Sequence, residues 1–260
     1  MTGGLGFSTG TLYQKHPRHL VGAIGVIGRV MESEHIASTF PVELNIAYPR
    51  LFGTIYPLVA QAINELNLSE DALSIHLPTK TPYKSYDYRS FFNVILGFNG
   101  LLNIPIRNFV AHPLEDIECL DPFKKIAPVL IENMGGKVES TAIRPEHFEE
   151  YFEKGFRLCY DVQHALQMTS DIQNEWIKGM PSLVGRGLLG EVHISACNRT
   201  NPEKHELFTL GNYYQIPLFL RLTEAIPRDA RFIHEGVMHP NQPTIALIAE
   251  RILLRGLLPR

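Results

Sequence analysis

The chain has 260 residues, of which 45% are hydrophobic and 20% are charged, and its 24 lysines and arginines face 27 aspartates and glutamates for a formal net charge of −3. This composition excludes a collagen, a disordered tail and a disulfide-stapled miniprotein. The near-neutral balance also removes any general electrostatic basis for binding nucleic acid or a membrane surface. The length suits one large α/β barrel, so we expect residues 1–260 to form a single domain.

The cysteines and the N-terminal region predict a cytoplasmic protein. Cys119, Cys159 and Cys197 are too few and too far apart for a disulfide framework. The N-terminal residues contain no basic segment followed by an apolar one, so we expect no signal peptide. The longest apolar stretch, residues 20–27, is much shorter than the ~20 residues of a membrane span.

Short apolar segments bounded by turn residues predict eight β-strands. In chain order they cover 5–8, 42–47, 73–77, 108–111, 129–133, 157–161, 191–195 and 231–235. A strand in every ~32 residues is the spacing of a strand, a helix and two loops. Segments such as 129–131 are apolar on both faces, which is typical of a parallel sheet covered by helices.

The segments between the strands have the periodicity of amphipathic helices. Apolar residues recur at helical spacing over 59–66 and 245–252, and Pro145 and Gly155 bound a further helix. Strands alternating with helices predict an α/β protein with a single (β/α)8 TIM barrel, and an open doubly wound sheet is the alternative. We expect segments 79–88 and 171–186 to be loops that shape the substrate pocket.

Ionisable residues stand at the ends of six consecutive predicted strands, where barrels of this kind place their chemistry. They are His76, His112, Glu132, Asp161 with His164 three residues later, His193 and Glu235. One such residue alone is more often a hydrogen-bonded core residue, but six together would be costly at an apolar barrel mouth unless a cation satisfied them. We therefore predict a divalent metal site. Mixed imidazole and carboxylate ligands favour zinc, manganese, cobalt or iron over calcium.

The segment after the seventh predicted strand adds two further candidate ligands, Glu203 and His205. By themselves they would be read as part of a solvated charged loop. Because they follow His193 closely, they could form an arm that holds a second metal ion.

Together these residues resemble the xylose-isomerase-like TIM barrels, which include endonuclease IV and metal-dependent sugar isomerases and epimerases. The resemblance runs over nearly the whole chain. Its most specific parts are the segments 131–133 (Ile-Glu-Asn), 158–164 (Leu-Cys-Tyr-Asp-Val-Gln-His) and 192–195 (Val-His-Ile-Ser). It implies a TIM barrel that binds one to three divalent ions, zinc, manganese or cobalt, at the ends of its strands.

Endonuclease IV is similar in its set of metal ligands. The order of its trinuclear zinc ligands is matched by His76, His112, Glu132, Asp161, His164, His193, Glu203, His205 and Glu235. The chain departs from that enzyme at position 203, where endonuclease IV has aspartate and this chain has Glu203. It also departs in the acidic segment Pro-Leu-Glu-Asp-Ile-Glu at 113–118. An acidic loop at the barrel mouth repels a DNA backbone. This resemblance implies phosphodiester hydrolysis by a two- or three-zinc cluster, but the loop disfavours nucleic acid as a partner.

The 3-epimerases are similar in a different way. In them one metal is held by the equivalents of Glu132, Asp161, His193 and Glu235, and an arginine follows the histidine by six residues, as Arg199 does here. The resemblance implies that Glu132 and Glu235 are also the catalytic residues. A metal polarises the carbonyl and the adjacent hydroxyl of a sugar, and two carboxylates can then move protons on opposite faces of the carbon between them.

The leading expectation is a metal-dependent isomerase or epimerase acting on a small sugar, polyol or sugar phosphate, with His164 and Arg199 orienting the substrate. The phosphodiester hydrolase is the alternative, and a barrel that has lost its reaction is the third hypothesis. We expect no membrane partner. The apolar residues Tyr213, Tyr214, Phe219 and Leu220 could serve a homo-oligomer contact as readily as the core.

Overall fold

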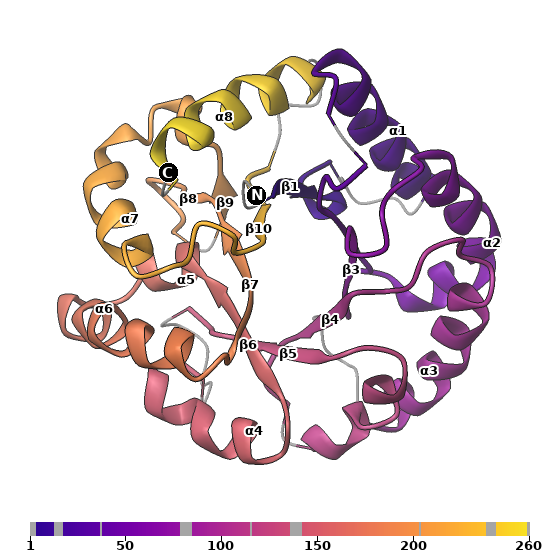
Figure 1. Cartoon of the computed structure of the whole chain (residues 1–260), viewed down its shortest axis with the longest axis horizontal. Coiled ribbons are helices and arrows are strands. Elements are labelled where there is room, and N and C mark those ends of the chain that lie inside the picture. Colours follow the sequence, from indigo (N-terminus) through magenta and orange to yellow (C-terminus); the bar gives the residue numbers. More distant parts are fainter. Residues whose placement is uncertain are drawn as a thin grey trace.

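A computed structural model describes residues 4–12, 18–36, 38–78, 85–114, 116–135, 142–202, 204–237 and 243–258. Eight strands close into a barrel in the order β1-β10-β7-β6-β5-β4-β3-β2. Every neighbouring pair is parallel, and the helices form a ring around the strands (Figure 1). The predicted (β/α)8 TIM barrel is therefore confirmed, and the open sheet is excluded.

Each predicted strand corresponds to one strand of the barrel. They are β1 (Leu5–Ser8), β2 (Val42–Asn45), β3 (Leu73–His76), β4 (Asn108–Ala111), β5 (Val129–Glu132), β6 (Arg157–Asp161), β7 (Leu189–Ile194) and β10 (Phe232–His234). Where the bounds differ from those predicted, most differences lie at the carboxyl ends, where the chain leaves the sheet to form the barrel mouth.

The helices that surround the barrel follow the strands in chain order. They are α1 (Arg18–Ser33), α2 (Pro49–Glu65), α3 (Ser85–Asn99), α4 (Glu149–Glu153), α5 (Val162–Leu166), α6 (Ser170–Gly185), α7 (Ile216–Thr223) and α8 (Pro243–Leu257). Short 3-10 turns complete the set: η1 (Thr9–Leu12), η2 (Ile117–Leu120), η3 (Phe123–Lys125), η4 (Pro145–Phe148), η5 (Phe208–Leu210) and η6 (Tyr213–Gln215).

The prediction of a loop over residues 171–186 is wrong, because this segment forms α6. Trp176, Met180 and Leu183 lie on one helical face and are buried, so their packing outweighs the cost of Pro181 inside the helix. The predicted loop at 79–88 is also partly wrong, since α3 begins at Ser85, and its residues 79–84 lie outside the described ones. The predicted helix between Pro145 and Gly155 is confirmed as η4 and α4, and Gly155 ends it with a φ of +81°.

A small hairpin that was not predicted from the sequence lies over the barrel mouth. Its strands, β8 (Ala196–Cys197) and β9 (His205–Glu206), are antiparallel, with Cys197 opposite His205. The side-chain oxygen of Asn198 accepts hydrogen bonds from the backbone of Thr200 and Asn201, which closes the loop between them. The hairpin thus returns the chain to the site.

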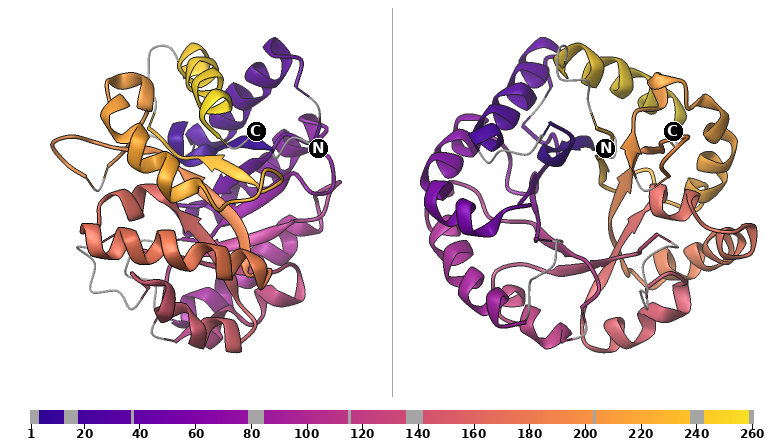
Figure 2. Two further views of the ribbon diagram at one scale, coloured as in Figure 1. Left: turned by 60° about the vertical axis from the view of Figure 1, so that its left-hand side comes forward. Right: turned by 180° about the vertical axis from the view of Figure 1, so that it is seen from behind.

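The apolar core lies between the strands and the helices, and includes Phe52, Phe98 and Trp176. The two views of Figure 2 show the ring of helices from the side and from behind. The barrel interior is different, because it contains buried charged side chains around the small apolar cluster of Val110, Leu130 and Cys159. All three cysteines are buried and free of disulfides.

Among the described residues, no helix combines the length and the apolar character needed to cross a membrane.

Candidate metal centre

The predicted site residues converge because of where their strands end. His76, Glu132 and Asp161 are the last residues of β3, β5 and β6, while His112 and Glu235 directly follow β4 and β10. Side chains alternate between the two faces of a strand, and the barrel register sets Asp161 beside His193 of β7. The carboxyl ends of parallel strands therefore bring these groups to one mouth.

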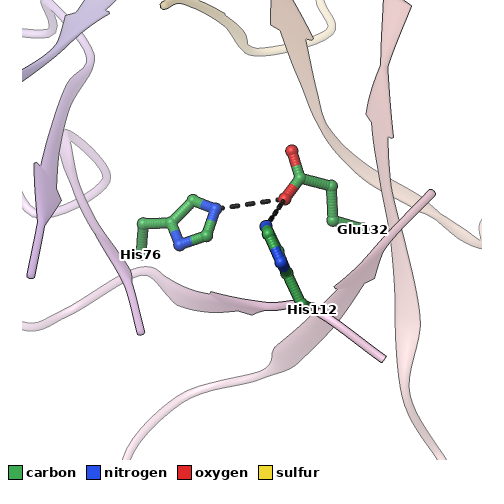
Figure 3. Close-up of side chains that lie close together, drawn as sticks. All are labelled: His76, His112 and Glu132. Carbon is green, nitrogen blue, oxygen red and sulfur yellow. Dashed lines mark hydrogen bonds and ion pairs between the residues drawn. The ribbon is translucent and has the colours of Figure 1, made fainter. Parts of the chain in front are cut away.

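Glu132 is at the centre of the first group of side chains. Its Oε2 lies 3.1 Å from Nε2 of His76 and 3.0 Å from Nε2 of His112 (Figure 3). Its Oε1 lies 3.1 Å from Nδ1 of His193. One buried carboxylate thus joins three imidazoles from three strands, and His76, His112 and Glu132 form a group that could hold a metal ion.

A second group shares Glu132 with the first. It consists of Glu132, Asp161, His193 and Glu235, whose candidate ligand atoms all lie within 4.8 Å of one another. Nδ1 of His193 is 3.3 Å from Oε2 of Glu235 as well as close to Glu132. Two carboxylates, one on each side of an imidazole nitrogen, are an arrangement that suits a divalent first-row ion.

Asp161 has one oxygen engaged by the protein and one left for the site. Its Oδ1 accepts hydrogen bonds from the backbone N–H groups of Gln163 and His164, which caps α5. Its Oδ2 is buried and has no aligned hydrogen bond within the described structure, although Nδ1 of His164 lies 3.4 Å away. The amide of Asn133 fixes the backbone of Asp161 in two hydrogen bonds, of 2.6 and 2.9 Å. A buried carboxylate oxygen without a donor is costly unless a cation meets it.

A third group lies on the other side of Asp161 and consists of Asp161, His164 and His205. Nδ1 of His164 is 2.6 Å from the carbonyl oxygen of Asn133, which favours the tautomer that leaves Nε2 as an acceptor. Nδ1 of His205 is 2.9 Å from Oγ of Ser195. Glu203, the remaining candidate ligand, lies outside the described residues.

The balance of charge around the mouth supports a cation. Five carboxylates lie at the mouth or just below it, in Glu43, Glu132, Asp161, Glu191 and Glu235. Within the described part of the chain, the buried guanidinium of Arg231 pairs with one of them, Glu191. Buried carboxylates need cationic or hydrogen-bonding partners, so the donor set fits one or more divalent ions.

The carboxylates perturb the neighbouring imidazoles strongly. Burial lowers the pKa of His76, but the hydrogen bond to Glu132 and the charge of that carboxylate more than offset this and raise it to about 10. Burial likewise raises the pKa of Glu132, while its three imidazole partners bring it well below the usual range. Burial lowers the pKa of His205 to about 4, because the nearby carboxylates do not compensate.

These shifts predict that the metal-free protein is most stable near pH 6.5. Above that pH the folded protein keeps the His76 proton that the unfolded chain loses, so this stabilisation disappears as the pH rises toward 10. Below it the unfolded chain binds a proton that His205 of the folded protein does not bind until about pH 4, so stability falls again. For each proton by which the folded and the unfolded state differ, the free energy of unfolding changes by about 1.4 kcal/mol per pH unit.

Urea unfolding in the presence of a chelator, repeated across this pH range, measures the effect. Saturating zinc is expected to flatten the alkaline side, because a metal ion replaces the proton on His76. A steady rise in stability from pH 6.5 to pH 9 with chelator present would contradict the prediction.

The other predicted residues lie outside the candidate metal groups described above. Arg199 is exposed and follows β8 in the hairpin that carries His205. Of the residues considered for an oligomer contact, Tyr213, Tyr214 and Leu220 are exposed and Phe219 is buried.

Three buried charged residues and one amide were missed. Glu43, Glu191 and Arg231 lie inside the barrel, and Asn133 orients Asp161. The sequence did contain a signal for the charged residues, because each of them lies beside apolar residues within a predicted strand. Glu191 also stands two positions before His193, so the two side chains are on the same face of β7.

No protein-family model and no curated protein sequence matches this chain. Solved structures do match it. A xylose isomerase domain containing protein from Salmonella typhimurium has a TM-score of 0.62 and 15% identity, covering 96% of this chain and 97% of that one. The 3-keto-D-glucoside 4-epimerase of E. coli has a TM-score of 0.57 and 12% identity, covering 98% and 99%. An L-ribulose 3-epimerase has a TM-score of 0.57 and 10% identity, covering 100% and 99%.

The structural likeness establishes the fold. Because the sequence identities are low, the activity has to be argued from the residues of the site. The resemblance expected from the strand-end residues is confirmed at that level: the chain has the fold of the xylose-isomerase-like TIM barrels.

Proposed function

We propose that the protein is a metal-dependent isomerase or epimerase acting on a small sugar, polyol or sugar phosphate. The observation that carries the proposal is the central group, in which Glu132 and Glu235 approach Nδ1 of His193 to 3.1 and 3.3 Å and Asp161 completes the set. Two glutamates beside one cation site are what proton transfer on two faces of a carbon requires. Two of the solved structures that share this fold are named as sugar epimerases.

In this proposal Glu132, Asp161, His193 and Glu235 hold the ion, which when bound makes the C–H beside a ketose carbonyl acidic. One of the two glutamates removes that proton and the other returns a proton to the opposite face. Glu132 is buried and held ionised by three imidazoles, so it is present in the unprotonated form that the base requires. Glu235 is 12% exposed, so it can exchange its proton with solvent more readily.

His164 and Arg199 remain the proposed substrate-binding residues. The carbonyl of Asn133 occupies Nδ1 of His164, so Nε2 is the nitrogen that would meet a substrate hydroxyl or a metal. Arg199 is exposed on the hairpin, where a guanidinium could pair with a phosphate of the substrate.

Hydrogen exchange tests the proposal directly. The protein is loaded with manganese or cobalt and incubated in D2O with a panel of ketoses and ketose phosphates. We expect deuterium at the carbon next to the carbonyl of at least one substrate, because the abstracted proton is replaced from solvent. Glu235→Gln is expected to slow this exchange by about 10²–10⁴-fold, whereas Glu224→Gln, which changes an exposed glutamate after α7, should leave it unchanged. An absence of deuterium from every substrate, at full metal occupancy, would count against the proposal.

A second candidate is phosphodiester hydrolysis by a metal cluster, and the two outer groups favour it. The group of His76 and His112 shares Glu132 with the central group, and the group of His164 and His205 shares Asp161. Metal ions held side by side by shared carboxylates generate hydroxide and stabilise a leaving oxygen.

The metal content of protein purified without chelator separates the two candidates. Three zinc ions per chain together with cleavage of an abasic DNA duplex would favour the hydrolase. One ion per chain without cleavage would favour the isomerase or epimerase.

A further inference from the structure

A second layer of charged side chains lies in the barrel directly below the metal centre. Nε2 of His193 is 2.9 Å from Oε2 of Glu43 on β2 and 3.3 Å from Oε1 of Glu191 on β7. All three side chains are buried. The opposite nitrogen, Nδ1, faces Glu132 and Glu235. The imidazole of His193 therefore stands between two pairs of carboxylates, one pair on each edge of its ring.

The two lower carboxylates differ in their partners. Glu191 is paired with Arg231, whose Nε donates to Oε2 of that residue. The other donors of Arg231 are taken by the carbonyl oxygens of Asp71 and Ala72 and by Oγ of Ser74. The charge of Glu191 is thus balanced by a guanidinium that is fixed to the floor of the barrel.

Glu43 has no such guanidinium among the described residues. The groups that face it are the imidazole of His193 and the hydroxyl of Ser8. Within the described part of the chain, neither carboxylate oxygen of Glu43 has a well-aligned hydrogen bond. A buried carboxylate in this position is costly unless a cation or a donor faces it, and Nε2 of His193 faces it at 2.9 Å. The aligned hydrogen bond of that nitrogen goes to Oε1 of Glu191, at 3.3 Å.

We propose that Glu43 is the positioning residue that prepares His193 for the metal. A neutral imidazole carries one hydrogen, so a carboxylate that accepts it at Nε2 leaves the lone pair on Nδ1. That lone pair then faces the space between Glu132 and Glu235. Carboxylates that accept the second N–H of a metal-bound histidine fix its orientation and make it a stronger ligand. The inference rests on the proposed metal-dependent function.

The geometry separates this role from that of a metal ligand. Glu43 contacts the edge of the His193 ring that points away from Glu132 and Glu235, so an ion bound at Nδ1 would not touch it. Glu191 approaches the same nitrogen with Oε1, in an aligned hydrogen bond of 3.3 Å, while its Oε2 accepts from Arg231. It therefore holds the Nε2–H of His193 together with Glu43.

The test is the metal affinity of Glu43→Gln, which keeps the volume of the side chain and removes its charge. We expect zinc and cobalt to bind about 10–100-fold more weakly than to the unaltered protein, as measured by competition with a chromophoric chelator. The visible absorption of the cobalt-loaded variant is expected to shift, because the orientation of one ligand changes. Glu43→Asp, which keeps the charge but moves it back by one methylene, should bind with intermediate affinity.

Glu250→Gln is the matched control. Glu250 is also a buried glutamate that faces a histidine, His234, but it belongs to α8 outside the barrel. Its replacement is expected to lower the melting temperature and to leave metal affinity and the cobalt spectrum unchanged.

The outcomes distinguish this inference from the proposed function. Metal affinity and a cobalt spectrum in folded Glu43→Gln equal to those of the unaltered protein would overturn the role of Glu43, even if deuterium exchange succeeded. Weaker metal binding with the expected spectral shift would support it, even if no sugar substrate exchanged. If Glu43→Gln does not fold, Glu43→Asp decides: metal affinity equal to that of the unaltered protein would overturn the inference, and a loss with a spectral shift would support it.

Discussion

Glu132→Gln is expected to remove most of the bound metal and to lower kcat/KM by about 10³-fold or more. The reason is its place in the centre, since its two carboxylate oxygens face His76, His112 and His193 at 3.0 to 3.1 Å. Glu132 belongs to at least three candidate metal groups: one with His76 and His112, one with Cys159 and His193, and one with Asp161, His193 and Glu235. Glutamine keeps the shape of the side chain but supplies neither the negative charge nor a second acceptor.

Metal analysis after dialysis, together with the D2O exchange rate, measures this effect. His112→Ala provides a graded comparison, because the side chain of His112 is 26% exposed and, of the groups described above, His112 belongs to the outer one with His76 and Glu132. We expect it to cost at most one ion and to leave the central group occupied. Full metal occupancy in Glu132→Gln would show that the ions bind elsewhere.

Arg231→Met is expected to have the largest effect on stability, about 3–5 kcal/mol of the free energy of unfolding. Arg231 is buried beneath the candidate metal centre, where it pairs with Glu191 and donates to backbone carbonyls. The substitution leaves the carboxylate of Glu191 buried without its cation and removes one donor from each of those carbonyl groups. Both are costly in a low-dielectric interior.

Chemical denaturation of the metal-free protein measures the loss. The double variant Arg231→Met with Glu191→Met is expected to recover part of it, because it removes both charges instead of one. Arg186→Met is the matched control, since Arg186 forms an exposed ion pair with Glu149, and such pairs contribute little to stability. A loss in Arg231→Met no greater than in Arg186→Met would contradict the prediction.

The strands were predictable because their pattern is local. Segments 5–8, 108–111 and 157–161 are short apolar stretches bounded by turn residues, and the structure has strands with the same bounds. The failure at α6 has the opposite cause. Its glycine and proline are local features of a loop, whereas the burial of Trp176 and Met180 against the barrel is a tertiary effect that stabilises the helix in spite of them.

The buried layer below the site could not be predicted for a related reason. Strands covered by helices on one side and by the barrel interior on the other are apolar on both faces. A glutamate in such a strand, as Glu43 is in β2, therefore gives no local indication of which face it occupies or which partner neutralises it. The contact between Arg231 and the carbonyl of Asp71 joins residues that are far apart in the chain.

The sequence alone determined the order of the eight barrel strands and the ionisable residues at their ends, because both depend on neighbours along the chain. Only the tertiary structure decided which atoms meet. Closure of the barrel through β1 and β10 brings the strand ends around one axis, where Glu132 reaches three imidazoles and His193 stands between two pairs of carboxylates. Such a centre depends on the direction of side chains from strands distant in sequence, and this direction is set by register and packing.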